Sequence, residues 1–199
     1  MAKRVLLTGI IGGIILFLWG GLYHDVLPFG LVGLKDLPND QAIIAAMKPS
    51  IPQAGMYLFP ATGLSPDASR AERAAKMKEV DAKAASGPQG VLIYRPVGVP
   101  LSPKMLATEA STNIIQALLV AFVLAQFGLR RFASRLGLAF VIGIIASITT
   151  NISLWNWYGF PTPWIMNQIT YLILGYFLLG IVVAAIVKAS APKAVAAGA

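Results

Sequence analysis

Residues 136–187 read LGLAFVIGIIASITTNISLWNWYGFPTPWIMNQITYLILGYFLLGIVVAAIV. Two long apolar runs, residues 136–154 and 164–187, flank a short segment that is crowded with tryptophan, tyrosine and proline. A transmembrane helix needs about 20 mostly apolar residues, and both runs meet this requirement. The stretch therefore predicts two membrane helices that are joined by a short, aromatic external turn.

The rest of the chain adds two further apolar segments, residues 5–23 and 113–129. Of the 199 residues, 57% are hydrophobic and only 12% are charged, and the mean hydropathy is +0.72. These values are typical of a membrane protein rather than of a soluble domain. No small-x-small cleavage site follows the first segment, so we predict a retained anchor rather than a signal peptide.

The charged residues divide unevenly between the two sides of the predicted membrane. One side carries seven cations and no acid, namely Lys3, Arg4, Arg130, Arg131, Arg135, Lys188 and Lys193. Residues 23–110 hold the other nine of the 16 Lys and Arg residues and all eight Asp and Glu residues. The positive-inside rule therefore predicts cytoplasmic termini and an external insert. Because topology accounts for seven of the eight excess positive charges, we predict no nucleic-acid partner.

These patterns predict a mainly α, integral membrane protein with four transmembrane helices in a bundle and a small α/β extracytoplasmic cap between helices 1 and 2. The predicted bounds are 1–23 for helix 1, 24–110 for the cap, 111–188 for helices 2–4 and 189–199 for a cytoplasmic tail. The second membrane helix is expected to begin near Pro103.

Within the cap, Asn39 or Asp40 is predicted to cap a helix that ends before Pro49. Ser65 is predicted to cap a second helix, with Pro66 at its first position, and Gly87-Pro88 is predicted to end it. The stretches GMYLFP (55–60) and GVLIYRP (90–96) are short, β-prone and apolar, each ends in proline, and together they predict a two-stranded ribbon.

Small residues recur at four-residue spacing in every predicted membrane helix, which favours close approach of helix backbones in lipid. The predicted packing positions are Gly9 and Gly13, then Ala117, Ala121 and Ala125, then Ala139, Gly143 and Ser147, then Gly180 and Ala184. The same stripes also suit contacts between subunits, so they leave the stoichiometry open.

The aromatic segment NISLWNWYGFPTPW, residues 151–164, has two interpretations. Tryptophan and tyrosine concentrate at membrane interfaces, where an apolar ring meets a polar N–H or O–H group. Polar residues accompany them and suggest instead an external ligand cleft; these are Thr149, Thr150, Asn151, Asn156, Asn167 and Gln168. The candidate ligand-binding residues are His24, Asn151, Trp155, Asn156, Trp157, Tyr158 and Trp164.

His24 is the only histidine of the chain, and cysteine is absent. The sequence therefore lacks the ligands for a zinc site or for haem held by two histidines, and we predict no metal site. We also predict no cofactor, with a single-ligand haem or (bacterio)chlorophyll at His24 as the alternative and an interfacial structural role as the preferred interpretation.

No motif of a known enzyme class is present, neither GxSxG, HExxH, a Walker loop nor a dinucleotide fingerprint. We therefore predict no catalytic residues and no enzymatic activity. Glu109 is interpreted as an ion-pair partner of Arg95 or Lys104 rather than as a catalytic acid. The centres of the apolar segments carry no charged residue, so a transporter is the least favoured function.

The chain resembles a family of uncharacterised bacterial four-helix inner-membrane proteins. The resemblance covers nearly all of the sequence and is carried by GIIGGIILFLWGGLYHDVLPFG, PQAGMYLFP, GPQGVLIYRP, LSPKMLATEASTN and WNWYGFPTPW. It implies the bacterial inner membrane and the architecture above, and it implies no activity.

Two function classes follow. The first is a non-catalytic accessory or structural subunit of a larger inner-membrane complex, respiratory or photosynthetic, whose partners are the lipid bilayer and other membrane-protein subunits. The second is a ligand-binding or sensing protein with an external site between the cap and residues 151–164.

Overall fold

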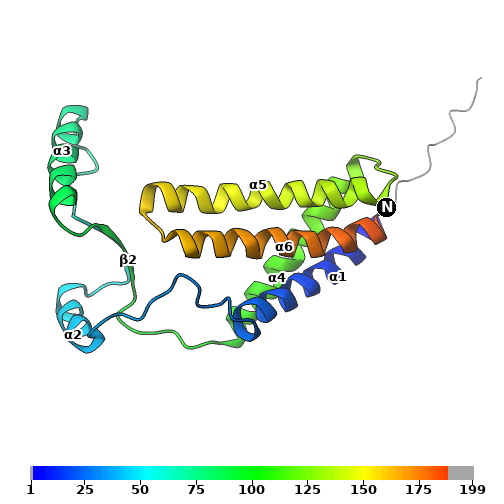
Figure 1. Ribbon diagram of the computed structural model, residues 1–199, viewed down its shortest axis with the longest axis horizontal. Helices are drawn as coiled ribbons and strands as arrows, with labels where there is room; N and C mark the ends of the chain where they lie inside the picture. The colour runs from blue at the N-terminus through cyan, green and yellow to red at the C-terminus, as the bar shows by residue number, and fades with distance from the viewer. Residues whose placement is uncertain (1, 188–199) are drawn as a thin grey trace, which may run out of the picture. The chain divides into compact units, whose positions relative to one another are not determined.

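The computed structural model describes residues 2–187, and most of them are helical (Figure 1). The elements in chain order are α1 (Ala2–Gly21), the π-helical turn η1 (Leu22–Val26), α2 (Asp40–Ser50), β1 (Gly55–Phe59), α3 (Arg70–Ser86), β2 (Gly90–Tyr94), α4 (Pro103–Gln126), α5 (Phe132–Tyr158) and α6 (Thr162–Ile186). Four helical stretches are long and apolar enough to cross a membrane: Ala2–Val26, α4, α5 and α6. This confirms the prediction of a mainly helical, multi-pass membrane protein. Lys188, Lys193 and the predicted tail 189–199 lie outside the described residues.

The helix ends follow from local chemistry. α4 begins at Pro103, as predicted, and the Ser102 side chain accepts a hydrogen bond from the Met105 N–H at 3.4 Å. α5 continues to Tyr158, so most of the predicted external turn is helical. Neither glycine nor proline interrupts residues 144–158. The turn is confined to residues 159–161, where Gly159 adopts a left-handed conformation (φ 69°) that glycine tolerates best.

The described chain divides into two compact units, and the second comprises Asp36–Pro100 together with Trp157–Gly159. Its main segment, Asp36–Pro100, is shorter than the insert 24–110 that the sequence predicted. Residues 24–35 and 101–110 belong to the first unit with the membrane helices.

In the second unit, β1 and β2 form an antiparallel pair in which Met56 lies opposite Ile93, which confirms the predicted ribbon. α3 begins at Arg70 rather than near Ser65, because Ser69 and Glu72 form a reciprocal capping box. α2 begins after Asn39, whose side chain makes no cap hydrogen bond, and it runs through Pro49 to Ser50 instead of ending before the proline.

In the first unit, glycines bring α1 against α4. A Cβ atom built on Gly13 would lie 2.5 Å from the Cα atom of Ile114, so the two backbones are in direct contact there. Gly9, one turn earlier, lies against Leu118. The contacts run in opposite directions along the two helices, so α1 and α4 are antiparallel.

α6 packs on both α1 and α5. Trp19 and Tyr23 of α1 and η1 contact Tyr171 and Asn167, so α6 is antiparallel to α1, and Ala2 and Ile186 lie at the same end of this unit. α5 lies beside α6 (Figure 1), with Gly143 against Tyr176.

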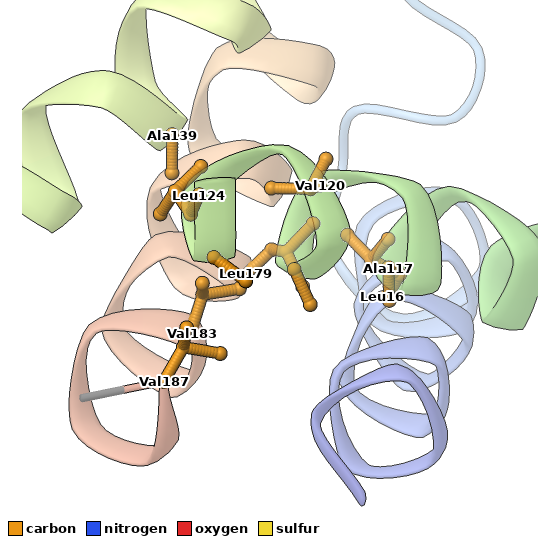
Figure 2. Packing of buried hydrophobic residues seen from close by; sticks show 10 residues of the cluster. Leu16, Ala117, Val120, Leu124, Ala139, Leu179, Val183 and Val187 are labelled. Carbon is orange, nitrogen blue, oxygen red and sulfur yellow. The ribbon is translucent and has the colours of Figure 1, made fainter. Parts of the chain in front are cut away.

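Ten of the buried hydrophobic residues form a cluster between these helices (Figure 2). Leu16 of α1, Leu124 of α4, and Leu179 and Val183 of α6 supply its larger side chains. The small residues around them are all buried: Gly9, Gly13, Ala117, Ala121, Ala125, Ala139, Gly143, Ser147, Gly180 and Ala184. Small side chains on facing stripes let large ones from the neighbouring helix interlock with them.

Candidate functional site

The C-terminal end of α1 departs from α-helical geometry at η1. This π-helical turn buries Tyr23, which is only 2% exposed. The Tyr23 hydroxyl donates to the Asn167 side-chain carbonyl at 2.7 Å, and the Asn167 side-chain N–H group donates to the Phe29 carbonyl at 2.9 Å. The chain after η1 is thereby held against α6. π-helical turns inside α-helices occur frequently at functional sites.

A groove of about 710 Å³ opens beside this turn. The groove is lined by residues from α1, η1, α4 and α6, including His24, Asp25, Glu109 and Tyr171. Apolar residues, among them Leu18, form the rest of its wall. Volumes of about 300–1,000 Å³ are usual for small-molecule sites, and such sites combine an apolar wall with a few polar groups. The groove has both properties.

The imidazole of His24 lies between aromatic rings. Its ring centroid is 4.8 Å from that of Tyr171 and 5.3 Å from that of Tyr23. Tyr171 also stacks on Trp19, at 6.4 Å and an interplanar angle of 8°, and its carbonyl accepts the Trp19 indole N–H at 3.1 Å. Three helical elements thus fix the aromatic side of the groove.

The two carboxylates of the groove have few partners. Glu109 accepts one long hydrogen bond, at 3.4 Å, from Asn113. The ion pair found among residues 2–187 joins Lys76 and Glu79, so the expected pair of Glu109 with Lys104 on the same helix does not form. Lys104 is the second residue of α4 and stands five residues before Glu109, whereas helical pairing needs a spacing of three or four residues.

A second pocket, of about 590 Å³, lies at the aromatic turn. Trp164, Phe160 and Pro163 line it together with Gly33 and Lys35. Gly33 has φ 81°, and a Cβ atom there would lie 2.5 Å from the backbone nitrogen of Trp164. The close approach of residue 33 to α6 explains why Trp164 is half-buried.

The candidate ligand-binding residues do not converge on one site within the described structure. Asn151 is buried, and its amide donates to the Ser147 carbonyl at 3.0 Å and to the Thr150 hydroxyl at 2.9 Å. Trp155 donates to the Thr162 hydroxyl at 3.1 Å across the turn. Asn156, Trp157 and Tyr158 are exposed. His24 lies at the groove and Trp164 at the second pocket.

Three further polar residues of that set, Thr149, Thr150 and Asn167, also have hydrogen-bond partners. The hydroxyl groups of Thr149 and Thr150 donate to the carbonyls of Ile145 and Ala146 in their own helix. Asn167 binds Tyr23 and Phe29. These bonds stabilise helix and loop, which is the usual way for a polar group in an apolar environment to be satisfied.

Two residues of the groove were not predicted as site residues from the sequence: Tyr171 was not named, and Glu109 was interpreted only as an ion-pair partner. Tyr171 stands within an apolar run, and its hydroxyl is a signal of a polar neighbour. Only the antiparallel packing of α1 on α6, however, brings it to His24.

No three His, Asp or Glu side chains within residues 2–187 are grouped so that they could hold a metal ion. Comparisons of the chain with protein-family models, with curated proteins and with solved structures gave no match.

Proposed function

We propose that the four apolar helices form one bundle across a bacterial inner membrane, with both termini cytoplasmic and Asp36–Pro100 as an extracytoplasmic cap. The antiparallel order of α1, α4, α5 and α6 supports this, because Lys3 and Arg4 then share one end of the helical unit with Arg130, Arg131 and Arg135. Cations concentrate on the cytoplasmic side of membrane proteins.

Within this architecture we propose that the protein binds an amphiphilic small molecule at its outer surface, without catalysing a reaction. The groove beside η1 carries the proposal: it joins a polar end at His24, Asp25 and Glu109 to an apolar wall at Leu18 and Phe17. Leu18 precedes Asp25 by seven residues, which corresponds to about 10 Å along a helix. A molecule with a polar head and an aliphatic chain matches that separation of polar from apolar surface.

Trp19 is a built-in reporter for this groove, because its ring stacks on Tyr171. The test uses protein in dioleoylphosphatidylcholine nanodiscs, with Trp155, Trp157 and Trp164 replaced by Phe so that Trp19 is the only tryptophan. Amphiphiles with a bromine at the end of a dodecyl chain quench indole fluorescence on contact. We expect at least one head-group class to quench Trp19 in a saturable manner.

A pair of glycine variants separates binding from partition into lipid. Gly21→Leu fills the groove, because a Cβ atom at Gly21 has Asp25 Oδ2 at 3.9 Å as its nearest neighbour. Gly137→Leu is the matched control, since a Cβ atom there meets nothing within 4 Å and Gly137 lies in α5 outside the groove. Saturable quenching that is lost only in Gly21→Leu supports the proposal. Linear, equal quenching in all three proteins contradicts it.

We also propose, as a second function, an accessory subunit of a larger inner-membrane complex, respiratory or photosynthetic. A stripe on α5 favours it: Val141, Ile145, Ile148 and Ile152 are each at least 40% exposed. Their alternating spacing of four and three residues is that of a helix–helix seam. The stripe lies opposite Gly143 and Ser147, which are buried.

Bulky substitutions distinguish a seam from a lipid-facing surface. Lipid tolerates a large apolar side chain, whereas a packed helix does not. We expect a pull-down in digitonin to recover a fixed set of larger subunits and Ile148→Trp to release them, while Leu119→Trp on the exposed face of α4 retains them. Recovery of the protein alone contradicts the accessory function.

A further inference from the structure

The charge of the groove is unbalanced. Asp25 and Glu109 line it, and the lining residues in the described part of the chain include neither lysine nor arginine. Both carboxylates belong to exposed residues, so a ligand can reach them. Two nearby carboxylates repel an anionic head group and attract a cation.

The position of the carboxylates along the helices fits the head of a membrane amphiphile. Glu109 stands six residues after Pro103, the start of α4, which corresponds to about 9 Å along the helix axis. Asp25 is near the end of η1. The apolar wall at Phe17 and Leu18 lies further along α1 toward its N-terminus, where the helical unit is apolar. The carboxylates are therefore at the outer end of the groove.

The groove is larger and more apolar than a site for a single inorganic ion would be. Its volume is about 710 Å³, whereas one water molecule occupies about 30 Å³ in the liquid. Most of its surface is apolar, and its lining includes Tyr171, an aromatic residue of the kind that attracts organic cations. An ammonium group on an aliphatic chain meets each of these conditions.

We infer that the groove binds a single-chain amphiphile with an ammonium head group, with Asp25 and Glu109 as counterions and Tyr171 as an aromatic contact. The inference rests on the proposed amphiphile-binding function and names its ligand class. The aliphatic chain lies along Phe17 and Leu18.

The experiment compares three brominated dodecyl probes in the Trp19-only protein: the trimethylammonium, the maltoside and the sulfate. The trimethylammonium is expected to bind most tightly, and its affinity is expected to fall as the salt concentration rises, because salt screens the carboxylates. Asp25→Asn and Glu109→Gln are each expected to weaken its binding about two- to fivefold, as for exposed ion pairs. The double variant is expected to lose about tenfold and the dependence on salt.

Two controls separate the charge effect from other changes. Asp81→Asn removes the same charge from α3 in the other unit, and its affinity for the trimethylammonium is expected to equal that of the wild type. Tetramethylammonium, which has the head group without the chain, is expected to compete only at far higher concentration. If tetramethylammonium competes at the same concentration as the dodecyl trimethylammonium probe, the groove binds a free organic cation and the inference of an amphiphile is wrong.

The outcomes distinguish this inference from the function on which it rests. If the maltoside or the sulfate binds as tightly as the trimethylammonium and Gly21→Leu abolishes that binding, the groove binds amphiphiles and the inference about charge is wrong. An unchanged affinity in the double variant also overturns the inference. If no probe quenches Trp19 in a saturable manner, the proposed function fails together with the inference.

Discussion

The guanidinium of Arg135, at the start of α5, donates two hydrogen bonds to the carbonyl oxygen of Ala184 near the end of α6, at 2.9 and 2.7 Å. It also donates to the carbonyls of Leu129 and Arg130, at 2.9 and 2.7 Å. The residue is only 6% exposed. Carbonyls at the end of a helix lack partners within the helix and carry its negative dipole, so they satisfy a buried cation without an acid. One side chain thus joins α5, α6 and the loop after α4.

Arg135→Met is expected to lower the free energy of unfolding by about 2–5 kcal/mol, because the buried carbonyls lose their donor. Arg131→Met is the matched control: it removes the same charge at the same end of the unit from an exposed residue. We expect it to change stability little. Unfolding in mixed micelles measures both, and equal stability of the two variants would contradict the assigned role.

Gly13→Ala is expected to loosen the contact of α1 with α4. Its Cβ atom would lie 2.5 Å from Ile114 Cα and 2.8 Å from Ile114 N, and a backbone cannot rotate away as a side chain does. Overpacking of this kind costs about 1–3 kcal/mol. Gly137→Ala, where the added atom meets open space, is expected to preserve or raise stability. Thermal unfolding of both variants in nanodiscs checks the prediction.

Tyr23→Phe removes the donor that binds Asn167 Oδ1 at 2.7 Å. We expect a loss of about 1–2 kcal/mol, the usual cost of an unsatisfied buried group. Faster amide hydrogen exchange is expected in residues 27–35, because Asn167 holds this segment through the Phe29 carbonyl. Tyr158→Phe, at an exposed tyrosine, is the control. Unchanged exchange in 27–35 would argue that the loop is held by other contacts.

The start of α3 is expected to be sensitive to acid. Hydrogen bonds from the side chain and then the backbone of Ser69 lower the pKa of Glu72 below its ordinary value of 4.5. A carboxylate with a lowered pKa stabilises the helix fully above pH 4.5, and the stabilisation is lost as the pH falls through the lowered pKa. Amide protection factors at residues 70–73 should fall in that window. Ser69→Ala should reduce this dependence, because only the backbone N–H of residue 69 then still donates to Glu72. It should leave the dependence of Glu79 unchanged, whose pKa is lowered by Lys76.

The proposed topology predicts which residues are accessible from outside the cell. The chain has no cysteine, so single cysteines can be introduced without a background. With a membrane-impermeant maleimide, we expect labelling of Ser86→Cys in intact spheroplasts and labelling of Ser134→Cys only after lysis. Both positions are exposed in the structure. The opposite pattern would reverse the orientation.

Local chemistry made much of the fold predictable. Four apolar runs, the Ser102–Pro103 start of α4 and the two strands of the ribbon depend on residues that are neighbours in the chain. Helix starts were less predictable where several residues compete: Ser65 and Ser69 both suit an N-cap, and Glu72 decides for Ser69 through the capping box. Likewise, the external turn was predicted to start at Asn151, but α5 continues to Tyr158, because Gly159 is the first residue of the segment that ends a helix.

By itself, the sequence determined the number and approximate position of the membrane-spanning helices, because burial in lipid requires a length and an apolar composition that can be read along the chain. Only the tertiary structure decided which polar residues meet. Glu109, Tyr171 and His24 come from three distant segments and share a groove because α1 packs antiparallel to both α4 and α6. From the sequence, Arg135 was counted only as one of the cations that set the membrane orientation. In the structure it is buried and binds the end of α6, which lies beside it. Such contacts depend on helix order, rotation and register, which apolar composition does not specify.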